Sequence, residues 1–118
     1  MSDHGIKVLV ERLRAFAADR DWEQFHSPKN LAMALSVEVA EIVEHFQWLT
    51  EEQSRDLDTS KKAQVAEELA DAFIYLVRLS DQLQIDLLKA ADQKLAVNES
   101  KYPAEQVRGS ARKYSEYD

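Results

Sequence analysis

The sequence predicts an all-α protein built as a four-helix bundle. Apolar residues recur every three to four positions through four long segments, which is the period of an amphipathic helix. The 118 residues include only two glycines and two prolines, too few turn residues for a sheet of many strands. The length is typical of a single domain. We therefore expect one helical domain in residues 1–103 and a polar C-terminal tail in residues 104–118.

The first two helices are expected on either side of a short connection, residues 21–26. The first helix should run from about Ile6 to Arg20. Ser27-Pro28 marks the start of the second, because an N-cap serine is followed by proline at the first helical position. This helix should run to about Trp48, with an apolar stripe formed by Leu31, Leu35, Val39, Ile42, Phe46 and Leu49.

The third helix is expected after a polar and acidic segment, residues 50–59, which reads as a solvated loop. Thr59 or Ser60 is its expected N-cap, and it should run to about Leu83. Its apolar face is unusually wide, which is typical of a helix buried on more than one side. We therefore expect this helix at the centre of the bundle or at a contact between subunits.

The fourth helix is expected between its N-cap, Asp86, and Tyr102-Pro103. Lys94, Asn98 and Lys101 recur at i, i+4 and i+7 and so share one helical face. Two cations and an amide on one face can bind phosphates, although the spacing alone favours a solvated surface.

Composition narrows the class of function. The formal net charge is −7, which argues against a nucleic-acid polymer as partner but not against a single nucleotide whose charges metal ions bridge. The absence of cysteine excludes disulfides and thiolate metal sites, and a reducing cytoplasm is the expected compartment. No apolar run reaches transmembrane length, and no signal peptide is recognisable. We expect no membrane partner.

Four carboxylates are the most informative feature of the chain. Glu38 and Glu41 lie in the second predicted helix, and Glu68 and Asp71 in the third. Each pair is spaced i, i+3, so its members share a face one turn apart. Four acids facing one cleft repel each other unless a cation lies among them. Mg²⁺, which takes oxygen ligands and pairs with phosphates, is the expected cation, with Mn²⁺ as a substitute.

The alternative is that these acids are ordinary surface charges. Glu38 argues against it, because it lies about 60° from the centre of the apolar stripe and an acid in that position needs a partner. The nearby bases do not obviously serve, since Lys61, Lys62 and Arg78 are expected to face solvent.

The helical wheel also separates these acids from their neighbours. Glu68, rather than Glu67, lies beside Asp71, and Glu44 points to the polar side of the second helix. His45 shares the flank of Glu41 and is close enough in the helix to contact the site. No histidine follows Glu41 or Glu68 at i+3, so a di-iron site of the Glu-x-x-His type is not expected.

Two tryptophans bracket the helix that carries the first acid pair. Trp48 shares the flank of Glu41, which would place a flat aromatic ring near the metal, in a position suited to stacking on a base. Packing in the core or at an interface is the alternative for Trp22 and Trp48.

These motifs together resemble the all-α nucleotide pyrophosphohydrolases of the MazG type. Glu38-Val-Ala-Glu41 followed by Glu68-Leu-Ala-Asp71 is similar to the ExxE…ExxD signature of that family. The resemblance looks closest to the dCTP pyrophosphatase branch. The segments that carry it are Asp21–His26, Pro28 with Asn30-Leu31, Phe46–Trp48, Glu67–Asp71, Tyr75–Val77, Lys94 with Asn98, Lys101–Pro103 and Ser110–Tyr114.

The resemblance implies hydrolysis of a nucleoside triphosphate to the monophosphate and pyrophosphate with Mg²⁺, and a homodimer or homotetramer with sites shared between chains. By the same resemblance the metal ligands would be Glu38, Glu41, Glu68 and Asp71. The residues that would bind the substrate are Trp22, His26, Asn30, Trp48, Tyr75, Lys94, Asn98 and Tyr102. Among the acids, we expect Glu41 to act as general base towards the attacking water.

Other functions remain open on the sequence. The same bundle could hydrolyse dUTP or phosphoribosyl-ATP instead of dCTP. It could also be a non-catalytic binding or regulatory module, whose acids hold a structural cation or pair with a basic partner.

Overall fold

The computed structural model describes residues 3–111 and confirms an all-α fold, with no strand in that range. The elements are α1 (Asp3–Asp19), the 3₁₀ helix η1 (Glu23–Phe25), α2 (Pro28–Phe46), α3 (Glu51–Ser54), α4 (Thr59–Gln82), α5 (Leu87–Lys101) and α6 (Ala104–Val107). The four long helices correspond to the four predicted helices. The part of the predicted tail from residue 112 onwards lies outside the described residues. Within the described range, no helix combines the length and apolar character needed to cross a bilayer.

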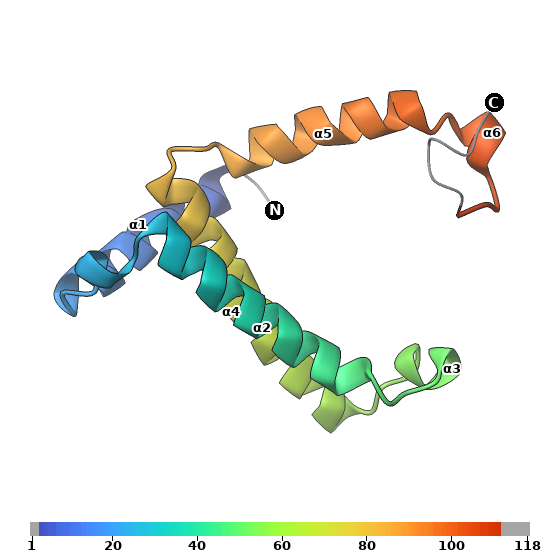
Figure 1. The fold of residues 1–118 in the computed structure, drawn as a ribbon, viewed down its shortest axis with the longest axis horizontal. Coiled ribbons are helices and arrows are strands. Elements are labelled where there is room, and N and C mark those ends of the chain that lie inside the picture. Colours follow the sequence, from blue (N-terminus) through green and yellow to red (C-terminus); the bar gives the residue numbers. More distant parts are fainter. Residues whose placement is uncertain (1–2, 112–118) are drawn as a thin grey trace. The chain divides into compact units, whose positions relative to one another are not determined.

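The described residues form two compact units, divided between Ile85 and Asp86. In the first unit α2 packs antiparallel along α4, and α1 contacts α4 (Figure 1). The second unit contains α5 and α6. The division predicted at residue 103 is a different one and stays a prediction.

Side-chain caps begin three of the long helices. Ser27 accepts a hydrogen bond from the backbone N–H of the residue three positions on, as do Asp58 and Asp86. Each cap satisfies one of the N–H groups that the first turn of a helix leaves without a partner. Ser27 and Asp86 were predicted from the sequence. The prediction of Thr59 or Ser60 for α4 was wrong, because Asp58 is the N-cap and its carboxylate accepts from Lys61 N at 2.7 Å.

Two short helices replace segments that were expected to be irregular. Residues 51–54 of the predicted solvated loop form α3, and residues 104–107 of the predicted tail form α6. The signal for α3 was present, since Thr50 and Gln53 form a capping box through both reciprocal hydrogen bonds. Helix α2 ends at Phe46, so Trp48 lies in the following turn and not in the helix.

Reversals of the chain after α1 and α4 use residues with positive φ. After α1, Asp21 has φ 53°, and Trp22 N donates to Ala17 O at 2.9 Å, which is the six-to-one bond of a Schellman motif. Gln84 plays the same part after α4, with φ 56°. The first reversal returns the chain towards α1, so that Trp22 packs edge-on against Phe16 with 5.5 Å between ring centroids.

The core of the single chain is small. Its buried apolar residues are Ala17, Leu31, Val65 and Val77. Several apolar residues of the predicted helix faces are instead exposed. They include Val39 from the predicted stripe of the second helix, and Leu69, Leu76 and Leu83 from the wide apolar face predicted for the third. The wide apolar face of α4 is therefore only partly covered by α1 and α2 within one chain.

Candidate metal centre and adjoining pocket

Three acidic side chains from two antiparallel helices converge in the first unit. Glu38 and Glu41 come from α2 and Glu68 from α4, and each offers a carboxylate oxygen that lies within 4.8 Å of the other two. The i, i+3 spacing puts the first two on one face of α2. The packing of α2 on α4 brings that face to Glu68. Three of the four acids singled out in the sequence thus share one place.

Burial separates these acids from their neighbours in the chain. Glu38, Glu41 and Glu68 are half-buried, whereas Glu44 and Glu67 are exposed. This agrees with the helical wheel, which set the last two on the solvated side of their helices. The helical period therefore predicts which of the many acidic residues lie in the cluster.

The acids of the cluster disfavour one another's charge. Burial, followed by the neighbouring Glu41 carboxyl and the charge of Asp71, raises the pKa of Glu38. Hydrogen-bond contact with the Glu41 carboxyl, followed by burial and by the negative charges of the other acids, raises the pKa of Glu68 to about 7. The close approach of carboxylates in a partly desolvated place is the cause of both shifts. A cation among them would relieve that repulsion.

The oxygen atoms of the cluster fit a divalent metal. Glu38 Oε2 and Glu68 Oε2 are buried and have no hydrogen-bond partner among the described residues, a state that is costly for a polar atom. The arginine ion pairs of the described range are made elsewhere, with Asp81 and Glu51. Carboxylate oxygens from two rigid helices are the donor set of a hard cation. We therefore identify the cluster Glu38–Glu41–Glu68 as a candidate metal centre.

Two further residues border this centre. Asp71 lies one turn after Glu68 on α4, is exposed, and contributes its charge to the raised pKa values of Glu38 and Glu68. It is not among the three acids whose oxygens lie within 4.8 Å of one another. His45, at the end of α2, places Nε2 4.0 Å from Glu68 Oε1, as the sequence had indicated for the flank of Glu41.

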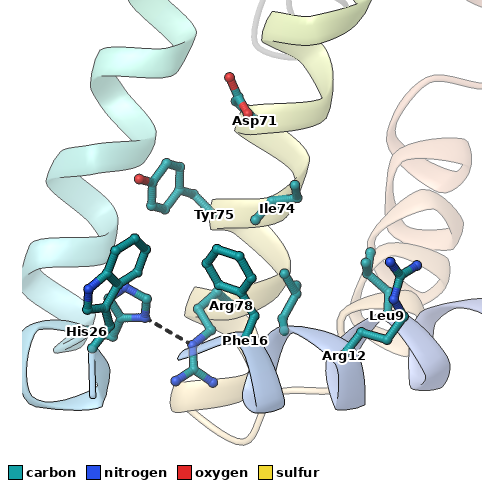
Figure 2. Close-up of a pocket in the computed structure, with 10 residues that line it drawn as sticks. Leu9, Arg12, Phe16, His26, Asp71, Ile74, Tyr75 and Arg78 are labelled. Atoms are coloured by element: carbon teal, nitrogen blue, oxygen red, sulfur yellow. Dashed lines mark hydrogen bonds between the residues drawn. The ribbon is translucent and has the colours of Figure 1, made fainter. Parts of the chain in front are cut away.

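A pocket of about 540 Å³ adjoins the acids through Asp71. From α1 its lining residues are Leu9, Arg12, Leu13 and Phe16, and from α4 they are Asp71, Ile74, Tyr75 and Arg78. Trp22 and His26, from the connection around η1, complete the lining. Figure 2 shows Asp71, Tyr75 and Arg78 following one another along α4. The volume is in the usual range of small-molecule sites, and the aromatic lining suits a flat ligand.

Four of the predicted site residues line this pocket, namely Trp22, His26, Asp71 and Tyr75. Asn30 does not, because its side-chain Nδ2 donates to Phe25 O at 3.0 Å and so fastens η1 to the start of α2. Trp48 also lies outside it, 87% exposed in the turn after α2.

The remaining predicted residues belong to the second unit. Lys94 and Asn98 lie in α5, and Tyr102 is the C-cap of that helix, with its N–H donating to Asn98 O. The half-buried Asn98 and the exposed Lys94 keep the i, i+4 relation predicted from the sequence. Their part in a site stays a prediction.

Sequence reasoning missed Arg78 and the contribution of α1. Arg78 was expected to face solvent, but its side chain is 4% exposed and lines the pocket. This expectation was wrong because the connection around η1 packs against the C-terminal part of α4, where His26 contacts Arg78. The spacing held a signal, since Asp71, Tyr75 and Arg78 recur on one face of α4.

The fold and the cluster together define a class: all-α proteins with a carboxylate cluster that could hold a divalent cation, beside an aromatic pocket. A family model narrows this class. The model of the MazG-like family matches residues 33–117, a span that contains all four predicted metal ligands. The chain belongs to the MazG-like family.

Relatives and a solved structure support this assignment. The dCTP pyrophosphatase 1 of Homo sapiens is 46% identical over 110 residues, which cover 91% of this chain and 65% of the relative. The protein of the same name from Rattus norvegicus is 44% identical over the same length. The chain thus spans slightly less than two thirds of the length of these curated relatives. A crystal structure of a pyrophosphatase from Archaeoglobus fulgidus matches with a TM-score of 0.80 and 39% identity, covering 87% of this chain and 96% of that one.

Proposed function

We propose that this chain is a Mg²⁺-dependent nucleoside triphosphate pyrophosphohydrolase, which converts a (d)NTP and water to the (d)NMP and pyrophosphate. The observation that carries the proposal is the convergence of Glu38, Glu41 and Glu68 within 4.8 Å, with two buried carboxylate oxygens that lack a partner. The relatives named dCTP pyrophosphatase and the pyrophosphatase of known structure support the same reaction class.

The metal would be held by Glu38, Glu41 and Glu68, with Asp71 as the fourth ligand. Mg²⁺ suits oxygen ligands and phosphate substrates, and Mn²⁺ would substitute for it. When bound, such a cation offsets the negative charge of the triphosphate and of the leaving pyrophosphate. A triphosphate with about four negative charges could not otherwise approach these carboxylates.

The side chains of this chain would divide the remaining work. Glu41 would accept a proton from the water that attacks the α-phosphorus, the bond to the bridging oxygen would break, and pyrophosphate would leave. Trp22 and Tyr75 would pack on the base and sugar in the adjoining pocket, which they line. Their aromatic faces suit a planar base.

The other predicted residues do not line this pocket, and we propose a separate part for each of them. Lys94, Asn98 and Tyr102 would bind the sugar and the phosphates. Trp48, which is exposed in the single chain, would stack on the base in a site that a homodimer or homotetramer completes. Asn30 would support the base subsite by fixing η1.

The proposed substrate is dCTP or a related deoxynucleotide, and the proposed role is the removal of unwanted nucleotides from a cytoplasmic pool. The relatives are named dCTP pyrophosphatase 1, which supports cytosine as the base of the substrate. A panel that also contains dUTP and phosphoribosyl-ATP would separate the alternatives that share this fold.

The direct test is hydrolysis of dCTP by the purified chain, with Mg²⁺ and with EDTA. We expect dCMP and pyrophosphate with Mg²⁺ and neither product with EDTA. Glu38→Gln should reduce turnover by two orders of magnitude or more, whereas Glu44→Gln, an exposed acid on the same helix, should leave it unchanged. Titration with Mn²⁺ followed by electron paramagnetic resonance reports metal binding separately. A chain that neither binds Mn²⁺ nor turns over any nucleotide of the panel would be a binding module, and the proposal would be wrong.

A further inference from the structure

Arg78 is a charged residue buried in the wall of the pocket. Its side chain is 4% exposed, and burial of a guanidinium is costly unless its N–H groups are hydrogen-bonded. The hydrogen-bond partners of the Arg78 guanidinium therefore decide how this charge is tolerated in the pocket wall.

Two donor atoms of Arg78, Nε and Nη1, connect three parts of the first unit, whereas its Nη2 is buried and has no hydrogen-bond partner among the described residues. Its Nε donates to His26 Nδ1 at 3.3 Å, the bond drawn as a dashed line in Figure 2. Its Nη1 donates to Asp81 Oδ2 at 3.5 Å, and Asp81 also accepts from Arg14 Nε of α1 at 2.8 Å. Asp81 thus holds the guanidinium in place from one side while the Nε–H group points at the imidazole.

This contact fixes the protonation of His26. A ring nitrogen that accepts a hydrogen bond carries no proton, so the neutral ring must carry its proton on Nε2. Burial, followed by the charge of Arg78, also lowers the pKa of His26, against the smaller opposing effect of Glu23. His26 therefore stays neutral near pH 7, with one N–H donor and its Nδ1 acceptor already occupied.

His26 is well placed to use that donor on a flat ligand. It lines the pocket together with Trp22, and the centroids of the two rings are 6.2 Å apart. A base packed beside the indole would meet the edge of the imidazole. A donor there favours bases that present a carbonyl oxygen or an unprotonated ring nitrogen at the same place.

We propose that Arg78 is a positioning residue that holds His26 in the Nε2–H form, so that His26 donates a hydrogen bond to an acceptor on the nucleobase. The nucleobase part of this proposal rests on the proposed function. The tautomer part concerns the protein alone, so the two can fail separately.

Two variants of matched length test the proposal. In Arg78→Gln the amide nitrogen occupies the chain position of Nε and can still donate to His26. In Arg78→Met a methyl group occupies that position and cannot. Both variants lack the guanidinium charge and its contact with Asp81, so a difference between them reports the amide of Gln. Its N–H group would favour the Nε2–H form of His26, whereas its carbonyl oxygen would favour the Nδ1–H form, and the spectrum tells which of the two is used. Thermal unfolding of both variants checks that the fold is kept.

The first measurement is the ¹⁵N chemical shift of the imidazole nitrogens, recorded without nucleotide and assigned with His26→Asn. We expect the Nε2–H form in the wild type and in Arg78→Gln, and a mixture of tautomers in Arg78→Met. The wild-type spectrum is a test even if both variants fail to fold. An Nδ1–H form in the wild type would overturn the proposal, as would identical spectra of the two variants.

The second measurement is the affinity for dCMP by calorimetry between pH 5.5 and 8. We expect Arg78→Met to bind about fivefold more weakly than Arg78→Gln, the size of effect expected for one hydrogen bond. Equal affinity of the two variants would overturn the role of Arg78 in binding and leave the hydrolase assignment intact. A wild-type chain that binds no nucleotide of any kind would overturn the nucleobase part together with the proposed function.

Discussion

At the scale of single residues, the same residue type takes different roles because its surroundings differ. Glu38 and Glu44 lie on one helix, yet the first is half-buried beside two other acids and the second is exposed. Burial and the neighbouring carboxyl groups raise the pKa of Glu38, which means that they destabilise its ionised form. A bound cation would offset this effect. The chemistry of the site therefore depends on which helix face meets the neighbouring helix.

Trp48 tests the proposed stacking role at this scale. Because its side chain is 87% exposed, Trp48→Ala should leave the melting temperature of the chain nearly unchanged. Stacking on a base is worth about 1–3 kcal/mol, so we expect nucleotide affinity to fall about 5- to 150-fold. Titration with dCMP by calorimetry measures this, and Trp48→Phe, which keeps a ring, should lose less. Unchanged affinity in the alanine variant would remove Trp48 from the site.

At the scale of elements, a polar network ties α1 to α4 near the pocket. Asp81 of α4 accepts from Arg14 of α1 through both carboxylate oxygens and also from the buried Arg78. These contacts lower the pKa of Asp81, with the hydrogen bonds from Arg14 as the largest cause. Few apolar side chains are fully buried among residues 3–111, so such polar contacts carry a larger share of the packing of α1.

Replacing Asp81 by Asn should therefore destabilise the fold. We expect a loss of about 1.5–3 kcal/mol, the range for hydrogen bonds to charged groups. The value should lie towards the lower end, because the Arg14 side chain is 59% exposed and is screened by water. Chemical unfolding in urea at pH 7 measures the loss. Asp92→Asn, an exposed acid on α5, is the matched control and should have little effect.

The difference in unfolding free energy between the wild type and Asp81→Asn should depend on pH in a defined way. A carboxyl group whose pKa is lowered in the folded state stabilises the protein fully when the pH is above the ordinary pKa of that group, which is 3.8 for Asp81. This stabilisation is lost as the pH falls through the lowered pKa of the folded state. The difference in stability between wild type and Asp81→Asn should therefore be constant from pH 5 to 8 and should shrink below about pH 3.8. A difference that persists unchanged at pH 2 would mean that the charge of Asp81 does not contribute.

At the scale of the whole molecule, apolar side chains remain uncovered on the first unit. Leu69 and Leu76 of α4 and its C-cap residue Leu83 follow one another at intervals of seven and are all exposed. Exposed leucines that recur on one helical face favour an interface, and a chain of this size gains stability from association. A second copy of the chain, as proposed above, would cover this stripe.

Leu76→Glu should therefore weaken the assembly. A charge in an apolar contact is costly to bury, so we expect the sedimentation coefficient to shift to a smaller species, or the chain to unfold as it dissociates. Gln64→Glu places the same charge at an exposed position of the same helix and should leave sedimentation unchanged. A wild-type chain that sediments as a 13.6 kDa monomer would contradict the assignment of this surface to an interface.

Much of the fold could be predicted because helix formation depends on residues close in the chain. The caps Ser27 and Asp86 lie next to the helices they begin, and the apolar period located all four long helices. The acids Glu38, Glu41 and Glu68 were found for the same reason, because a shared face follows from the helix period alone. The predicted N-cap of α4 was wrong by one residue. Helix α3 was not predicted, because a single helical turn is too short to show an apolar period.

The sequence by itself determined the all-α class, the four long helices and the acids that share a helical face, since each of these follows from local spacing. The tertiary structure alone decided that the pocket lies between α1 and α4 and that Arg78 is buried in its wall. The contact of Arg78 with His26 joins residues 52 positions apart. Such a contact depends on how two segments pack, and packing is set by the shapes and charges of all the surfaces that meet, which the period of one helix does not contain.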